Sequence, residues 1–288
     1  NGQVAGANLV IAEGSDVTFN DVADFANLTI HGSVNVDLTQ QNSFTDAGSV
    51  SGKGVLNVNH KNAWVINDSV DRDFSNFTGT VNMVSPATSI VMGLGDAPDY
   101  TDAAKDSYFA DGTRVNVADS QAIYLAGNGV ATGIIFNGTE GATLYVGNMV
   151  SAQDNSVAVM EDQSEDFTQT LSGDNSSFAG TVNVSEGAQL TLTNALGAKA
   201  INMNFEATQS ATDVEDVLDT QLNLAKDGLV IAGNIIGDAN DVINVKEDAV
   251  LTADNTEFVG IVNIEAGRDL TLKGDLSKDN KGEINFAT

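Results

Sequence analysis

The sequence predicts an all-β fold, a right-handed parallel β-helix (solenoid) of about 13 coils with loop insertions. Two patterns predict it: a strand-like motif that occurs two full times and once in part, and a finer period of about 20 residues. The composition agrees, because 42% hydrophobic residues suffice for a core while 28 Gly and 2 Pro indicate many turns. We expect a single domain over residues 1–288, with insertions near 86–114, 151–166 and 206–220.

The motif is clearest in two segments that align without gaps, LSGDNSSFAGTVNVSEGAQLTL (171–192) and LTADNTEFVGIVNIEAGRDLTL (251–272). They are identical at 11 of 22 positions, and a partial copy, VDRDFSNFTGTVNM, occupies 70–83. In each copy Phe, Gly and two apolar residues alternate with small or polar residues, which predicts a half-buried strand. A Gly on the inward face beside a Phe leaves room for the ring.

A triplet of the form apolar-Asn-apolar carries the finer period. In the C-terminal half it begins at 182, 201, 222, 243, 262 and 284, and earlier at 34, 56, 81 and 115. A unit of about 20 residues cannot enclose its own core, so it must stack on its neighbours. If the apolar residues face inward, the Asn side chains face outward on adjacent coils and can form an amide ladder. Alternatively, this polar face is an adhesive surface for a second copy or a glycan.

A β-sandwich or propeller is the competing fold, because its strands also alternate. Such folds predict hairpin turns at the strand spacing, typically Asn-Gly or Asp-Gly. Those dipeptides occur at Asn137–Gly138 and Asp227–Gly228 but do not recur at that spacing. The pattern therefore favours the β-helix.

The charge excludes several kinds of partner. With 40 acidic against 12 basic residues the net charge is -28, which argues against binding nucleic acid or an anionic membrane surface. The absence of Cys excludes disulfides and thiol chemistry, and we expect no membrane insertion, since no apolar run reaches the length of a membrane helix. The chain begins NGQVAGANLV and ends GEINFAT inside an expected strand, so we expect it to be a piece of a longer protein.

Residues for catalysis are scarce, so we expect no enzyme and no catalytic or cofactor-binding residues. There is no Gly-x-Ser-x-Gly motif, and the two His, His31 and His60, each follow an expected strand. The three Arg lie far apart, at Arg72, Arg114 and Arg268, and the single tight cluster of opposite charges is Asp71-Arg72-Asp73. A carbohydrate-active β-helix enzyme, a lyase or hydrolase, stays open as an alternative, because paired carboxylates are frequent.

Calcium is the cofactor hypothesis. Asp96, Asp99 and Asp102 crowd one insertion together with Asp106. Carboxylate oxygens suit Ca²⁺, although this spacing differs from that of an EF-hand loop. The predicted metal ligands are Asp96, Asp99 and Asp102.

The motif at 171–192, with the Gly-x-Gly-x-Leu at Gly52, Gly54 and Leu56, resembles the strand repeats in passenger domains of bacterial autotransporters (type V secretion). The resemblance implies an adhesin-like β-helix exported through the outer membrane of a Gram-negative bacterium and displayed at the cell surface. The resemblance covers the repeats of a passenger domain and no other part of an autotransporter, so the chain would be a fragment of the passenger. The implied partners are a host surface protein or glycan, or a second copy through self-association. A non-binding structural stalk is the further alternative.

Overall fold

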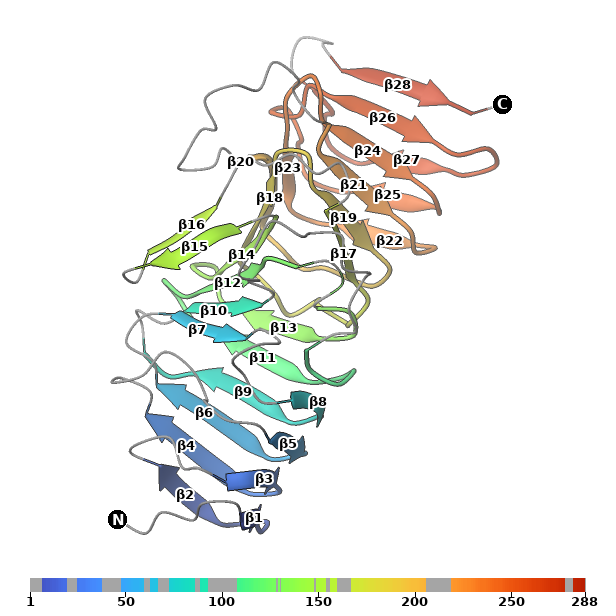
Figure 1. Cartoon of the computed structure of the whole chain (residues 1–288). Helices are drawn as coiled ribbons and strands as arrows, with labels where there is room; N and C mark the ends of the chain where they lie inside the picture. The colour runs from blue at the N-terminus through green and yellow to red at the C-terminus, as the bar shows by residue number, and fades with distance from the viewer. Residues whose placement is uncertain are drawn as a thin grey trace.

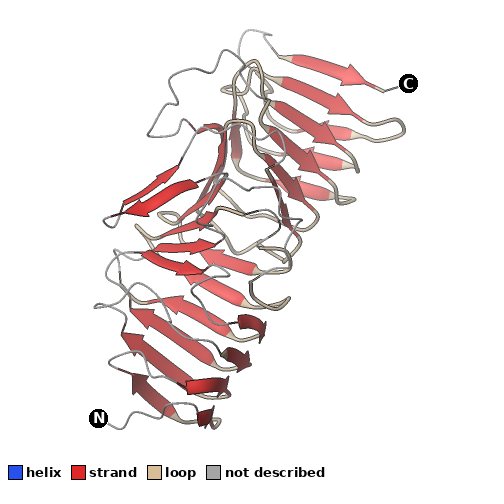
Figure 2. Cartoon of the chain, viewed as in Figure 1, coloured by secondary structure: helices blue, strands red, loops and turns tan. Residues whose placement is uncertain are grey.

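The structure, a computed structural model, is an elongated stack of β-strands with its two termini at opposite ends (Figure 1). It describes residues 7–19, 25–37, 48–59, 63–66, 73–85, 89–92, 108–127, 129, 131–147, 149–153, 156–159, 167–205, 219–277 and 282–287. Figure 2 shows strands and loops but no helix among these residues. Accordingly, this part of the chain has no helix of the length and hydrophobicity needed to cross a membrane.

The described strands form five parallel sheets and one antiparallel hairpin. Sheet A contains β1 (Ala7–Ile11), β3 (Phe25–Ile30), β5 (Ser49–Gly52) and β8 (Asp73–Phe77). Sheet B contains β2 (Asp16–Phe19), β4 (Ser33–Asp37), β6 (Val55–Asn59), β9 (Thr80–Met83), β11 (Arg114–Val117) and β13 (Ile135–Gly138). Sheet C contains β7 (Ala63–Ile66), β10 (Ser89–Met92), β12 (Ala122–Leu125), β14 (Thr143–Val146), β18 (Thr181–Ser185), β20 (Ala200–Phe205) and β23 (Asn234–Ile236).

The remaining strands lie toward the C-terminus. Sheet D contains β17 (Thr168–Leu171), β19 (Gln189–Leu192), β21 (Gln221–Leu224), β24 (Val242–Val245), β26 (Ile261–Ile264) and β28 (Glu283–Phe286). Sheet E contains β22 (Leu229–Ile231), β25 (Ala249–Leu251) and β27 (Leu270–Leu272). The hairpin pairs β15 (Met149–Gln153) with β16 (Ser156–Val159).

Three strands per full turn wind the chain into a parallel β-helix of the right-handed type, as the sequence predicts. For example, β5, β6 and β7 are consecutive in sequence and belong to sheets A, B and C. The helix has about nine turns, so the estimate of about 13 coils is too high. The estimate allowed too little for the insertions, because stacked side chains are 19 and 21 residues apart in some turns but 25, 32 and 34 in others.

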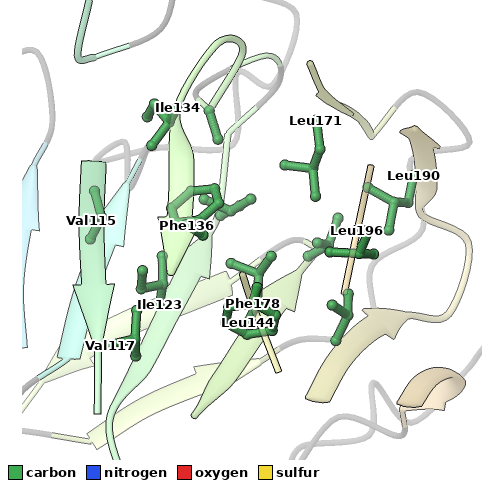
Figure 3. Close-up of a cluster of buried hydrophobic side chains, with 14 of the residues drawn as sticks. Val115, Val117, Ile123, Ile134, Phe136, Leu144, Leu171, Phe178, Leu190 and Leu196 are labelled. Carbon is green, nitrogen blue, oxygen red and sulfur yellow. The ribbon is translucent and has the colours of Figure 1, made fainter. Parts of the chain in front are cut away.

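The inward-facing side chains form one continuous core along the rod. Strand β9 shows how the core is built, because Val81 and Met83 are buried while the alternate residues Thr80 and Asn82 are only partly buried. Figure 3 shows a section of this core, a cluster that includes Phe136 of β13, Leu144 of β14 and Phe178, which precedes β18. The strands are short and most alternate between buried and more exposed residues, so their stability depends on the turns above and below them.

The Phe and Gly of the motif pack as the sequence predicts. A Cβ atom added at Gly180 would lie 2.9 Å from Cζ of Phe178, and one at Gly79 would lie 2.6 Å from Cζ of Phe77. Real Cβ atoms do not approach carbon that closely, so the ring fits only because the residue two positions later has no side chain.

The apolar-Asn-apolar part of the three motif copies forms strands of three different sheets: β9 in sheet B, β18 in sheet C and β26 in sheet D. From β9, sheet B continues through β11 and β13 to Phe178, and the next strand is β18. From β18, sheet C continues through β20 and β23 to Phe258, and the next strand is β26. Successive copies are thus three full turns apart, plus the corner that joins one sheet to the next. They are not separated by four or five turns of about 20 residues.

The Asn triplets also belong to three sheets rather than one series. Sheet C holds Asn183 and Asn202, sheet D holds Asn223, Asn244, Asn263 and Asn285, and sheet B holds Asn35, Asn57, Asn82 and Asn116. The step from Asn202 to Asn223 looks like one more turn in sequence, but β20 and β21 are consecutive strands of neighbouring sheets, and segment 206–220 supplies most of the residues between them.

The expected insertions all adjoin strands of sheet C. Segment 86–114 contains β10 and ends at the first residue of β11. Segment 151–166 contains most of the β15–β16 hairpin, which follows β14, and segment 206–220 follows β20 directly. Most of the other residues of these segments lie outside the described part of the chain.

Candidate interaction face

The predicted calcium ligands Asp96, Asp99 and Asp102 lie outside the described residues, as does Asp106. Among the residues that the structure does describe, no group of three or more acidic or His side chains could hold a metal ion. A calcium site at Asp96, Asp99 and Asp102 stays a prediction. Titration calorimetry of the whole chain tests it, because saturable uptake would have to disappear in the triple Asn variant.

The other candidates for chemistry are spread over the rod. His31 is exposed in the turn between β3 and β4, and His60 lies outside the described residues. Arg114 is exposed at the start of β11, whereas Arg268 forms an ion pair with Glu247 at 2.6 Å. Asp71 and Arg72 are not described, and Asp73 accepts the backbone N–H of Ser75 at 2.8 Å. The structure brings none of the described members of this set together.

The outward Asn side chains of sheets B and D form two amide ladders, which confirms that part of the prediction. In sheet B, Nδ2 of Asn57, Asn82, Asn116 and Asn137 donates to Oδ1 of the Asn one turn earlier at 2.8, 2.7, 2.7 and 2.9 Å. In sheet D, Asn244, Asn263 and Asn285 do the same at 3.0, 3.1 and 3.2 Å. These amides hold successive turns in register.

The outer row of sheet C differs from both ladders. It consists of residues paired in register across the sheet: Val91, Tyr124, Tyr145, Asn183, Asn202 and Ile236. The rings of Tyr124 and Tyr145 stack with their centroids 4.6 Å apart and their planes at 6°. Both tyrosines are half-buried, while Val91 is fully buried and Asn183 is 8% exposed. Burial and, to a lesser degree, Tyr145 raise the pKa of Tyr124 to about 12.

Two corners of the rod carry acids beside bases. At the corner between sheets B and C, hydrogen bonds from the Thr139 hydroxyl and the Gly141 N–H lower the pKa of Asp119, and the charge of Lys199 adds to the effect. Where the chain leaves sheet D, hydrogen bonds from Ser176 lower the pKa of Asp174, with a smaller contribution from Lys226. Lys226 also donates from Nζ to Oδ1 of Asn194 at 2.8 Å.

The corner between sheets C and D carries a buried acid, Asp241, which is 3% exposed. Burial is the main cause that raises its pKa to about 7, and the charges of Asp238 and Glu186 raise it further. Hydrogen bonds from the Asp238 N–H and the Thr220 side chain oppose this shift.

Sequence reasoning missed three of these features. Tyr124 and Tyr145 replace the Asn of the triplet in AIYL and TLYV, a signal that a search restricted to Asn passes over. Asn175 and Asn255, both buried, accept the backbone N–H of Phe136 and Ile235 at 2.7 Å, and the shared Asp-Asn dipeptide of the motif was their signal. Nothing in the sequence separates Asp241 from the other 39 acidic residues, because its burial depends on the turns around it.

The parallel turns, the continuous core and the amide ladders define the class of the protein as a β-solenoid. Comparison of the chain with protein-family models, with curated proteins and with solved structures finds no match in any of the three.

Proposed function

We propose that the chain is a surface-displayed adhesive β-helix that attaches to a host surface protein or glycan, or to a second copy, through the outer row of sheet C. The observation that carries the proposal is the half-buried Tyr124–Tyr145 stack at outward positions of sheet C. Aromatic side chains with a polar end are enriched at recognition surfaces because they add large contact area at low entropic cost. The outward amides of sheets B and D are engaged in ladders.

The architecture supports this choice of face. A rigid scaffold that carries variable segments is a common arrangement for binding. The three long inserted segments all adjoin strands of sheet C, which is also the sheet that carries the tyrosine pair. The proposal places the protein at the bacterial cell surface, in line with the passenger repeats that the motif resembles.

A binding screen on the purified chain tests the proposal. It combines an aggregation assay of cells that display the chain with arrays of glycans and host surface proteins. The double variant Tyr124→Thr/Tyr145→Thr keeps residues suited to strands but removes both rings. We expect it to lose binding by roughly tenfold or more.

The matched control is Val230→Thr on sheet E, since Val230 is outward and 49% exposed. It should bind as the unchanged chain does. Equal binding by the double variant would show that the contact does not involve the outer row of sheet C. No binding by the unchanged chain would favour the non-binding stalk. Cleavage of an arrayed glycan would favour the carbohydrate-active alternative.

A further inference from the structure

Asp241 sits in a hydrogen-bond chain that crosses three successive turns of the rod. Oδ2 of Asp241 accepts the backbone N–H of Asp238 at 2.6 Å. The Thr220 side chain, one turn earlier, hydrogen-bonds to the Asp241 carboxyl. Oγ1 of Thr220 in turn accepts the N–H of Gly187, a further turn back, at 3.2 Å. The carboxyl therefore ties the turn at 237–241 to the two corners stacked on it.

The surroundings of this carboxyl disfavour its charged form. Its own turn contributes Asp238, and the corner after β18 contributes Glu186; both act on Asp241 with negative charge. The corner before β21 adds Asp219, exposed, beside Thr220. On the opposite side, the segment before β26 adds Glu257, also exposed, while Gly260 approaches so closely that a Cβ there would lie 2.1 Å from the Asp241 carbonyl oxygen. Gly237 lies against the carboxyl itself, since a Cβ there would be 2.8 Å from Oδ2 of Asp241.

The other two corners behave in the opposite way. Asp119 and Asp174 are exposed, they accept hydrogen bonds, and the charges of Lys199 and Lys226 also favour their ionised forms. Their pKa values are lowered, so they stay ionised at any physiological pH. Asp241 alone of these three carboxyls changes its charge near neutrality.

We propose that the corner between sheets C and D is a proton-sensitive latch. Protonated Asp241 holds the turn at 237–241 closed against β21 and β24, and ionised Asp241 loosens it. The direction follows from linkage: the pKa in the folded chain, about 7, exceeds the ordinary value of 3.8, so the folded state binds the proton more tightly. The stabilisation is complete in acid below the ordinary value and is lost as the pH rises through about 7.

Hydrogen exchange of the whole chain at pH 5 and pH 8 tests the latch. Asp241→Asn mimics the protonated carboxyl and keeps an oxygen to accept the Asp238 N–H. Relative to this variant, the unchanged chain should open its amides at 234–245 faster at both pH values, and the ratio of the two opening rates should grow by about a hundredfold from pH 5 to pH 8. The matched control is Asp254→Asn, which removes an exposed carboxylate that also accepts a backbone N–H, that of Asp275 at 3.1 Å.

The control should shift exchange at 234–245 equally at both pH values. An Asp241→Asn chain whose exchange relative to the unchanged chain is the same at pH 5 and pH 8 would overturn the latch. A second measurement needs no variant: the side-chain carboxyl carbon of Asp241, followed by NMR in the full chain, should titrate near neutrality. Titration near the ordinary value of 3.8 would equally overturn the proposal.

Discussion

The ring of Phe178 occupies the space that a side chain at Gly138, one turn earlier, would need. A Cβ atom at Gly138 would lie 2.5 Å from Cδ2 of Phe178, and the two residues form a parallel bridge. The same relationship joins Phe258 to Gly237, with 2.7 Å to Cδ2. Each of these two rings therefore packs against a glycine of the previous turn, which couples the two turns through one contact.

Replacing Gly138 by Ala should destabilise the chain, because the added methyl group overpacks the corner. We expect the free energy of unfolding to fall by about 1–3 kcal/mol in urea titrations. Phe178→Leu shortens the opposing side chain, so the double variant should lose less than the sum of the two single changes. Strict additivity would show that the two residues do not share this space.

The buried amide of Asn175 should matter more than its exposed neighbour Asp174. Oδ1 of Asn175 accepts the Phe136 N–H at 2.7 Å, and Nδ2 donates to the Gly173 carbonyl at 3.0 Å. Asn175→Ala leaves both backbone groups buried without a partner and should lower the free energy of unfolding by about 2–4 kcal/mol. Asp174→Ala is the control, with a clearly smaller expected loss because this side chain is exposed. Similar losses in both variants would contradict the assigned role.

The sheet B ladder should be weakened most by a change at its middle. Asn82 donates to Asn57 at 2.7 Å and accepts from Asn116 at 2.7 Å, whereas Asn285 ends its ladder with a single amide bond, to Asn263 at 3.2 Å. Asn82→Val should cost about 1–2 kcal/mol in thermal unfolding, and Asn285→Val less than about 0.5 kcal/mol. Equal costs at the two sites would mean that ladder bonds do not stabilise the turns.

Tyr124 should ionise late in an alkaline titration. Its pKa is raised to about 12, chiefly by burial, and stability from this group is lost as the pH rises from 10.0 through about 12. Absorbance of tyrosinate should show one late-titrating group that Tyr124→Phe removes. Tyr145→Phe should move that group slightly toward lower pH, because the smaller charge effect of Tyr145 is gone. A titration in which all four Tyr ionise together would exclude this environment for Tyr124.

The sequence alone predicts the class of fold but not the path of the chain through it. Period-two alternation around Val81 and a unit too short to enclose a core are local properties, and both are visible without coordinates. The assignment of each strand to a sheet is not local: β18 and β26 have nearly the same sequence and belong to different sheets. The sheet to which a strand belongs depends on the number of corners between it and the preceding strands. Loop insertions make that number impossible to count from the sequence.

The candidate site was less predictable than the fold. Amide ladders follow from Asn at an outward position, so they could be foreseen. The Tyr124–Tyr145 pair and the buried Asp241 depend on which strands become neighbours across about 20 residues of chain. The pKa of Asp241 in particular is raised chiefly by burial and further by the charges of Asp238 and Glu186, and only the stacking of turns creates the burial and brings Glu186 near.

The placement of the motif on three different sheets has a consequence for how such rods change length. One copy and the chain up to the next advance the path by three windings plus a third of a winding. A gene duplication or deletion of one such unit would not merely lengthen or shorten the protein. It would rotate the rest of the rod about its axis by about 120°, so a given surface beyond that point would face a different direction.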